Sequence, residues 1–366
     1  MSQRRISRKI RVGPIEIGGG APVSVQSMTN TDTHDVAATL AQIGRLRKAG
    51  CDLVRLAVDD QAAAEALAQI AEASPMPIIA DIQFDPMMAV AAIENHAAGV
   101  RLNPGFLHDG CDLRPLVKAM LDHNVPVRIG ANSGSVRANL LKKKISSGLA
   151  PDAAMAEALV DSTLENCEKL EKLGLRDIKV AVKSADVRIC VQASRSLAAR
   201  SDYPIHLGVT EAGIPSRGIV KSAAGIGALL LDGIGDTIRV SLTAPPEEEA
   251  VAGVRILEAA GLRDAAPEIV SCPTCGRTEF DLVALANKVE RLVVELKSGG
   301  AKLNLRKIAV MGCPVNGPGE ARSADLGIAG TRSGKLIIFR HGEVTGAYEA
   351  DEGFARFRTE LENFRG

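Results

Sequence analysis

Between residues 23 and 242, short apolar runs alternate with stretches that carry the 3.6-residue periodicity of amphipathic helices. Several helical stretches end at a glycine that directly precedes the next run, as in Ala-Gly50-Cys and Ala-Gly99-Val. Eight strands separated by helices favour a closed (β/α)8 barrel of the TIM type over an open doubly wound sheet. The predicted strands are Val23–Met28, Leu53–Val58, Ile78–Ile82, Val100–Leu102, Val125–Ile129, Ile178–Val182, Ile205–Val209 and Ile238–Leu242.

Outside the eight strands, glycine and proline residues mark where the remaining predicted elements begin and end. A small hairpin is expected at residues 8–25, and the longest connection should hold a basic loop at Leu140–Ser147 before a helix that runs to Leu173. The alternation stops near residues 261–267, so we predict a barrel domain over residues 1–263 and a smaller α+β domain over residues 264–366. That domain should contain a helix at Asp281–Lys297, a strand at Lys307–Met311, a hairpin at 335–344 and a terminal helix at about 352–363.

Three cysteines and one glutamate in the smaller domain form a candidate metal centre. Cys272 and Cys275 share a C-x-x-C turn, Cys313 follows a predicted strand, and Glu320 lies beyond a Gly-Pro-Gly break that lets the chain fold back. A structural zinc site normally closes with four Cys or His ligands, whereas three thiolates and a weakly held carboxylate suit an iron–sulfur cluster with one exchangeable iron. Spacing alone leaves zinc open as the alternative.

Composition excludes several other kinds of protein. Lysine plus arginine equals aspartate plus glutamate at 44 each, so no global positive field is available to attract nucleic acid or an acidic membrane. The chain has no tryptophan and two tyrosines, too few for base-stacking platforms, and no apolar stretch long enough to span a bilayer. We therefore expect a soluble, cytoplasmic protein. The cysteines without motif spacing should be small buried residues: Cys51, Cys111, Cys167 and Cys190.

Five predicted barrel strands each carry one cation between apolar neighbours. Buried cations are costly without an opposite charge, and barrel active sites lie at the carboxyl ends of the strands, where several cations would meet. Because guanidinium groups bind phosphate oxygens in bidentate fashion, we interpret the set as a pocket for a phosphorylated small molecule. Five separate ion pairs are the alternative. The cations are Arg55, Arg101, Arg128, Lys183 and Arg239.

Polar residues follow the same strands. Asn132 and Ser241 stand beside glycine- or threonine-containing turns, and Glu211 is a lone acid directly after the seventh strand. Glu211 is the natural candidate for proton transfer in a site rich in hydrogen-bond donors. His206, earlier on that strand, is interpreted as a packed core histidine.

Seven segments, in order along the chain, resemble the 4-hydroxy-3-methylbut-2-enyl diphosphate synthase family, in its two-domain bacterial form. They are VQSMTNTDT (25–33), VRLNPG (100–105), VRIGANSGS (127–135), HLGVTEAG (206–213), GIGDTIRVSLT (233–243), CPTCGR (272–277) and GCPVNGPGE (312–320). The resemblance implies an iron–sulfur oxidoreductase of isoprenoid biosynthesis. Its reaction is the reductive ring opening of 2-C-methyl-D-erythritol 2,4-cyclodiphosphate to 4-hydroxy-3-methylbut-2-enyl diphosphate, with loss of water and electrons from reduced flavodoxin or ferredoxin.

The resemblance also implies roles for individual residues. Cys272, Cys275, Cys313 and Glu320 would bind a 4Fe–4S cluster, and Glu211 and Glu320 would be catalytic. The family forms homodimers in which the cluster domain caps the partner's barrel. Gln83 stands where the family usually has histidine, and Phe106 where a polar residue is common. The diphosphate would be bound by Arg55, Arg101, Arg128, Asn132, Lys183, Arg239 and Ser241.

Overall fold

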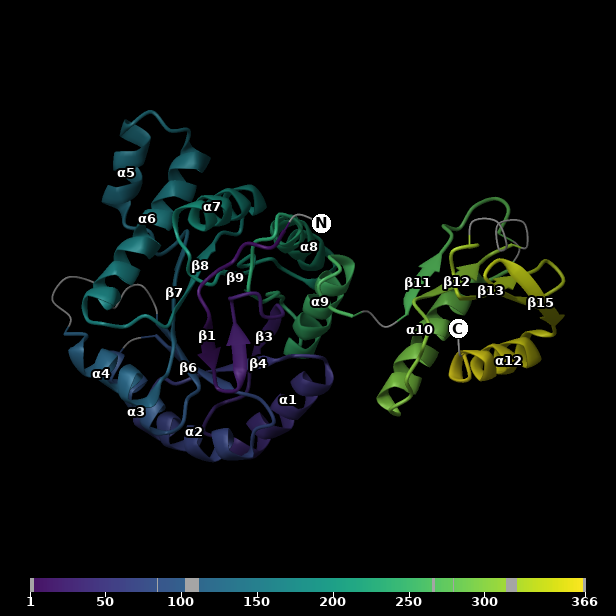
Figure 1. Ribbon diagram of the computed structural model, residues 1–366, viewed down its shortest axis with the longest axis horizontal. Helices are drawn as coiled ribbons and strands as arrows, with labels where there is room; N and C mark the ends of the chain where they lie inside the picture. Colours follow the sequence, from purple (N-terminus) through teal and green to yellow (C-terminus); the bar gives the residue numbers. More distant parts are fainter. Residues whose placement is uncertain are drawn as a thin grey trace. The chain divides into compact units, whose positions relative to one another are not determined.

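The computed structural model describes residues 3–83, 85–102, 112–264, 267–278, 280–313 and 321–364. The chain divides into two compact units, Met1–Arg263 and Asp264–Gly366 (Figure 1). An antiparallel hairpin of β1 (Ile10–Val12) and β2 (Ile15–Ile17) precedes the barrel, as the sequence predicts. No helix in the described part of the chain is both long and apolar enough to cross a membrane.

The first unit is a (β/α)8 barrel, which confirms the predicted fold class. Seven neighbouring strand pairs are parallel, and a bridge between Val180 and Ile205 joins the two remaining edges. The strands are β3 (Ser24–Met28), β4 (Leu53–Ala57), β5 (Ile78–Ile82), β6 (Gly99–Leu102), β7 (Val127–Asn132), β8 (Ile178–Lys183), β9 (His206–Leu207) and β10 (Thr237–Ile238).

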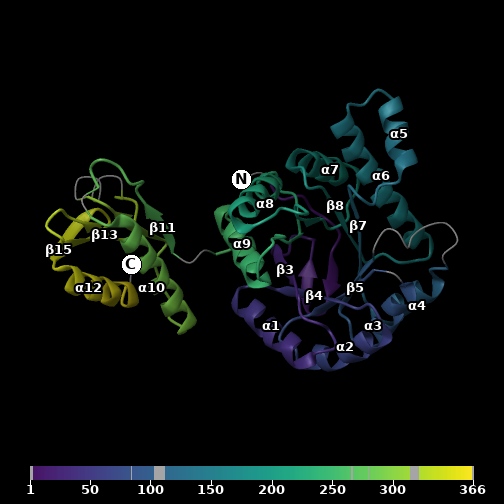
Figure 2. The ribbon, with the colours of Figure 1, turned by 180° about the vertical axis from the view of Figure 1, so that it is seen from behind.

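Helices surround the barrel strands, as Figure 2 shows from behind. Apolar side chains on the outward faces of the strands pack against these helices in one continuous core, to which Leu46, Leu67 and Leu159 belong. The helices are α1 (Val36–Lys48), α2 (Gln61–Ala73), α3 (Pro86–Glu94), α4 (Arg114–His123), α5 (Ala138–Ser146), α6 (Pro151–Lys172), α7 (Val187–Arg200), α8 (Pro215–Leu231) and α9 (Pro246–Ala259).

The predicted basic loop at Leu140–Ser147 is wrong, because all of these residues except Ser147, the C-cap, belong to α5 (Ala138–Ser146). No residue of α5 is buried, and the helix packs on α6 rather than on the barrel strands. Leucine and lysine are good helix formers, and contact with α6 supplies the support that a nine-residue helix lacks alone. The cysteines outside the motif are buried as expected at positions 51, 167 and 190, while Cys111 lies outside the described residues.

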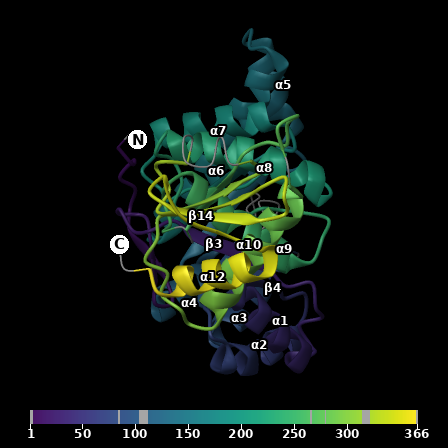
Figure 3. The ribbon, with the colours of Figure 1, turned by 90° about the vertical axis from the view of Figure 1, so that its right-hand side faces the viewer.

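The second unit is built on a five-stranded mixed sheet in sequential order. Two helices cover one of its faces (Figure 3), where Ile308 and Val310 join their apolar core, while Ala309 and Met311 belong to a smaller core. The predicted helices, hairpin and strand are present, and two further strands, β11 and β13, were not predicted. The elements are β11 (Glu268–Ser271), α10 (Leu282–Ser298), β12 (Lys307–Met311), β13 (Leu326–Gly330), β14 (Leu336–Arg340), β15 (Glu343–Tyr348) and α12 (Ala350–Glu362).

Candidate active site

Strand register brings four ionisable residues into one row inside the barrel. Asp81 pairs with Arg101, Arg101 with Arg128, and Arg128 with Lys179 on successive parallel strands. Register partners in a parallel sheet share a face, so their side chains are neighbours. Asp81, Arg128 and Lys179 are all buried, which makes this interior far more polar than the branched apolar layers usual in such barrels.

Asp81 holds two of the predicted cations together. Its carboxylate oxygens lie 3.4 Å from Arg55 Nε and 2.9 Å from Arg101 Nη1, and Gln83 Nε2 donates to Oδ2 at 3.0 Å. Burial by itself would raise the pKa of Asp81, but Arg55, Arg101 and Arg128 outweigh it and lower the pKa below its usual value. The carboxyl therefore stays ionised and offsets part of the positive charge at this end of the barrel.

The positive charge is not fully neutralised. No ion pair of Arg128 or Lys183 occurs among the described residues, and buried Nε and Nη1 of Arg128 have no hydrogen-bond partner there. Burial, together with nearby arginines, lowers the pKa values of both side chains well below their usual range. Burial likewise lowers the pKa of Arg55 to about 9, with Arg239 and Arg101 adding to the effect and Asp81 opposing it. A bound anion would relieve these costs.

Arg239 is held by a carboxylate that the sequence analysis did not single out. Glu249 Oε2 on α9 lies 3.3 Å from Arg239 Nε and 3.2 Å from Nη2. Met28 Sδ, from β3, lies 3.0 Å from Arg55 Nη2 and 3.9 Å from Arg239 Nη1, so one thioether separates these two guanidinium groups. Arg239 belongs to the same charged cluster, because it lowers the pKa values of Arg55 and Lys183.

A cavity of about 680 Å³ lies over this cluster at the carboxyl ends of the strands. Of the predicted site residues it is lined by Arg55, Arg101, Asn132 and Glu211, while Arg128, Lys183, Arg239 and Ser241 are not part of its wall. The wall also includes residues that were not predicted as ligands, namely Asp81, Gln83, Ser133, Gly134, Ser135, Ser184, Ala185 and Thr210.

Glu211 has a strained backbone at the wall of this cavity. Its φ of 53° lies in the left-handed region, which costs a residue with a Cβ atom free energy, and its side chain is exposed. Such conformations are concentrated at functional sites, where the surrounding structure imposes them. His206, by contrast, is fully buried and its Nδ1 lies 2.7 Å from Thr237 Oγ1, as expected for a core histidine.

Lys179 predicts a measurable dependence of stability on pH. Burial, and secondarily Arg128, lowers its pKa from 10.5 to about 7, and its Nζ has no partner among the described residues. Between these pH values the unfolded chain binds more protons than the native protein, so this group makes the native state more stable as pH rises from 7 towards 10.5. At one pKa unit per about 1.4 kcal/mol, the gain from pH 7 to 9 is roughly 2–3 kcal/mol.

Urea unfolding at pH 7 and pH 9 measures this effect. Lys179→Met should be more stable than the wild type at pH 7. Between pH 7 and pH 9 its free energy of unfolding should increase by about 2 kcal/mol less than that of the wild type. The increase that Lys183 contributes remains in both proteins and serves as the internal reference. Equal increases in the two proteins would contradict the buried, unpaired position of Lys179.

In the second unit, two of the predicted cysteine ligands follow neighbouring parallel strands. Ser271 at the end of β11 pairs with Val310 of β12, so Cys272 and Cys313 emerge at the same edge of the sheet. Gly312 N donates to Cys272 Sγ at 3.3 Å. A Cβ atom on residue 312 would lie 2.9 Å from Thr278 Cγ2, so glycine at this position lets the backbone pass close to the Thr278 side chain.

The C-x-x-C turn is also organised around sulfur. Cys275 N donates to Thr278 Oγ1 at 2.9 Å, and this hydroxyl lies 3.9 Å from Cys275 Sγ. A hydrogen bond from the Arg277 backbone, and then the Thr278 hydroxyl, lowers the pKa of Cys275. Donors directed at sulfur and adjacent strand ends are features of thiolate metal sites, so the described residues fit a cluster bound at this edge.

The ligand set itself is incomplete in the part of the chain that the structure describes. Within those residues, no group of three or more His, Cys, Asp and Glu side chains is close enough to hold a metal ion. Glu320 belongs to the segment 314–320, outside the described residues. Cys272 is half-buried, Cys275 exposed and Cys313 buried.

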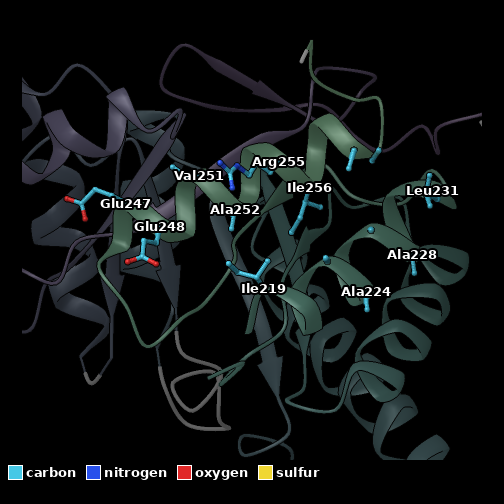
Figure 4. Close-up of a pocket in the computed structure, with 14 residues that line it drawn as sticks. Ile219, Ala224, Ala228, Leu231, Glu247, Glu248, Val251, Ala252, Arg255 and Ile256 are labelled. Atoms are coloured by element: carbon cyan, nitrogen blue, oxygen red, sulfur yellow. The ribbon is translucent and has the colours of Figure 1, made fainter. Parts of the chain in front are cut away.

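A second cavity lies outside the barrel, in a groove between α8 and α9 (Figure 4). It measures about 750 Å³ and its wall is largely apolar, with Ile219, Leu231 and Ile256 on it. Its charged lining residues are Glu247, Glu248 and Arg255. With no group of cations in its wall, this groove is unsuited to a diphosphate, and the cavity at the barrel mouth is the candidate site.

Comparison with known proteins agrees with this organisation. Residues 7–254 match the family model of the GcpE TIM-barrel domain, and residues 268–363 match that of the GcpE protein C-terminal domain. Several relatives are named 4-hydroxy-3-methylbut-2-en-1-yl diphosphate synthase (flavodoxin). The one from Desulfotalea psychrophila is 49% identical over 93% of this chain and 91% of its own length. The one from Salinispora arenicola is 52% identical over 94% of this chain and 85% of its own length. The protein of that name from Geobacter sulfurreducens is 49% identical over 92% of both chains. These matches confirm the resemblance, and the chain belongs to the GcpE family of 4-hydroxy-3-methylbut-2-en-1-yl diphosphate synthases.

Proposed function

We propose that this chain catalyses the family's reaction at the mouth of its barrel. 2-C-methyl-D-erythritol 2,4-cyclodiphosphate takes up two electrons and two protons and loses one water to give 4-hydroxy-3-methylbut-2-enyl diphosphate. The C–O bond of the ring breaks at the tertiary carbon, the diphosphate stays on the chain of the product, and the neighbouring hydroxyl leaves as water. The names of the relatives support this product and flavodoxin as the electron donor.

The observation that carries the proposal is the excess of buried positive charge. Asp81 pairs with Arg55 and Arg101, and Glu249 pairs with Arg239, but Arg128 and Lys183 have no carboxylate partner among the described residues. Burying unpaired cations is unfavourable unless a ligand supplies the missing charge. The diphosphate of the substrate is an anion of the required sign, and planar guanidinium groups match its oxygens.

Within this site, Arg55, Arg101, Arg128, Lys183 and Arg239 would bind the diphosphate and keep its charge out of water. Asn132 is the last residue of β7 and Ser241 follows β10, and both would donate hydrogen bonds to it. Glu211, whose backbone is strained at the cavity wall, would deliver a proton to the departing hydroxyl. Gln83 also lines the cavity and donates to Asp81; an amide cannot supply that proton.

We assign Cys272, Cys275, Cys313 and Glu320 as the ligands of a 4Fe–4S cluster. When bound, such a cluster would supply the two electrons singly. The chain's own contribution at this edge is a pair of hydrogen-bond donors directed at sulfur, the backbone N–H of Gly312 towards Cys272 and the hydroxyl of Thr278 towards Cys275.

Reduced flavodoxin, with ferredoxin as the alternative donor, would provide the electrons in the cytoplasm. The cation cluster and the cysteines lie on separate units of the chain. We include in the proposal a homodimer in which the cluster domain of one chain caps the barrel of the other. The molar mass of the anaerobic protein, measured by light scattering, tests this assembly.

Anaerobic turnover tests the function. The purified protein with reduced flavodoxin should convert the cyclodiphosphate to 4-hydroxy-3-methylbut-2-enyl diphosphate, detected by phosphorus NMR, and Glu211→Gln should lower kcat by about 10²-fold with little change in KM. Exposed Glu65→Gln, on α2, is the control and should behave as the wild type. No product from the wild type with an intact cluster would refute the function. Wild-type kcat in Glu211→Gln would refute only the role of Glu211.

A further inference from the structure

Three consecutive glutamates follow Pro246 in the first turn of α9, and they face in different directions. Glu248 is exposed and lines the outer groove together with Glu247 (Figure 4), whereas Glu249 is 5% exposed. Successive residues of an α-helix are turned by about 100°, so one of three neighbours can face the barrel while the others face outwards. Glu249 therefore lies in an environment that its neighbours do not share.

The Glu249 carboxylate contacts β3 and the segment that follows β10. Oε2 accepts from Arg239 Nε at 3.3 Å, from Arg239 Nη2 at 3.2 Å and from Ser27 Oγ at 3.2 Å. Oε1 accepts from the backbone N–H of Leu242 at 3.0 Å. One carboxylate thus fixes both the guanidinium of Arg239 and the backbone next to Ser241, two residues proposed to bind the diphosphate.

Helix capping does not explain this placement. An acid in the first turn interacts favourably with the helix dipole even when it is exposed, and Glu247 and Glu248 already supply that charge. A buried carboxylate costs free energy that only well-formed partners offset. The charged partner of Glu249 is Arg239 of the cation cluster, so its burial is explained by Arg239 and not by the helix.

We propose that Glu249 is a positioning residue of the substrate site, which fixes Arg239 and the Ser241–Leu242 segment in the geometry that binds the diphosphate. Without it, repulsion from Arg55, Arg128 and Lys183 would drive the Arg239 side chain away from the cluster. Glu249 occupies the Nε–Nη2 edge of Arg239, and Nη1 remains on the other side of the guanidinium, near Met28. The inference rests on the proposed function for the identity of the anion.

Glu249→Gln tests the proposal with minimal change of shape. Glutamine can still accept from Leu242 N through its one amide oxygen, and its amide nitrogen can donate to Ser27 Oγ, but it lacks the negative charge and the second oxygen that hold Arg239. We expect KM for the cyclodiphosphate to rise about 10- to 100-fold, with kcat within a few-fold, and the dissociation constant of inorganic pyrophosphate to rise similarly. Iron content and the unfolding temperature should stay near those of the wild type. Glu248→Gln, from the same helical turn, is the control and should leave KM unchanged.

A double-mutant cycle separates positioning from a general structural role. In the Arg239→Met background, Glu249→Gln should change KM and pyrophosphate affinity by less than about 3-fold, because the residue through which it acts is absent. The same large effect in both backgrounds, or a wild-type KM in Glu249→Gln, would overturn the proposal. Failure of the wild type to turn over the cyclodiphosphate would refute the proposed function instead, and the pyrophosphate measurements would still decide the role of Glu249.

Discussion

Replacement of Cys313 by alanine is expected to abolish cluster assembly and catalytic activity. Cys313 is buried directly after β12 and emerges beside Cys272, so no other thiol among the described residues is placed to substitute for it. Iron and acid-labile sulfide in the anaerobically purified variant should fall from about four per chain to near zero. Because cluster binding also contributes to folding, the second unit should lose stability as well.

Two control measurements test whether the loss of activity in Cys313→Ala comes specifically from loss of the cluster. Cys167→Ala, at a buried cysteine on the barrel helix α6, should retain full iron content and activity. The Cys313→Ala protein should still bind inorganic pyrophosphate, because the cation cluster lies in the other unit. A Cys313→Ala variant with about four irons per chain would show that the ligand assignment is wrong.

Arg128→Met should make the barrel more stable and at the same time lower the catalytic efficiency. Arg128 is buried with Nε and Nη1 unpartnered among the described residues, and its nearest charges are mostly other cations. An apolar side chain of similar length removes that cost, so we expect the barrel to become more stable by roughly 1–4 kcal/mol. The same change removes the phosphate contact proposed for Arg128, and kcat/KM for the cyclodiphosphate should fall by at least about 30-fold.

Urea unfolding and steady-state kinetics on the same preparation test both halves of this prediction. Arg114→Met is the matched control, since Arg114 is exposed and paired with Asp112, and it should change neither quantity appreciably. Loss of stability in Arg128→Met would mean that the arginine has a structural partner. Wild-type kinetics would remove Arg128 from the diphosphate site.

The sequence predicted the barrel and the cation cluster because both depend on short-range patterns. A period of two places Arg128 and Asn132 on one face of β7, and parallel pairing aligns Arg101 with Arg128 without further information. The carboxyl ends of all barrel strands lie at the same mouth of the barrel, independently of the details of the surrounding helices. The positions of the cations could therefore be inferred from the order of the strands alone.

The carboxylates that organise those cations could not be inferred in the same way. Glu249 lies in a run of three acids on a helix, and nothing local shows which of them faces Arg239. Asp81 could have been found, because it is the one acid within a predicted strand and stands in register with Arg101. The helix α5 was missed because its support comes from α6, a contact that periodicity does not reveal. Glu320 and residues 103–111 lie outside the described residues.

An anaerobic assay of iron and acid-labile sulfide, combined with a visible absorption spectrum of the wild-type protein, is the most direct test of the 4Fe–4S assignment. We expect about four irons and four sulfides per chain, with broad absorption near 400 nm that weakens on reduction. A colourless protein with one zinc per chain would contradict it. The cation cluster would then remain an anion site, and the C-x-x-C domain would be a zinc-stabilised unit without a part in electron transfer.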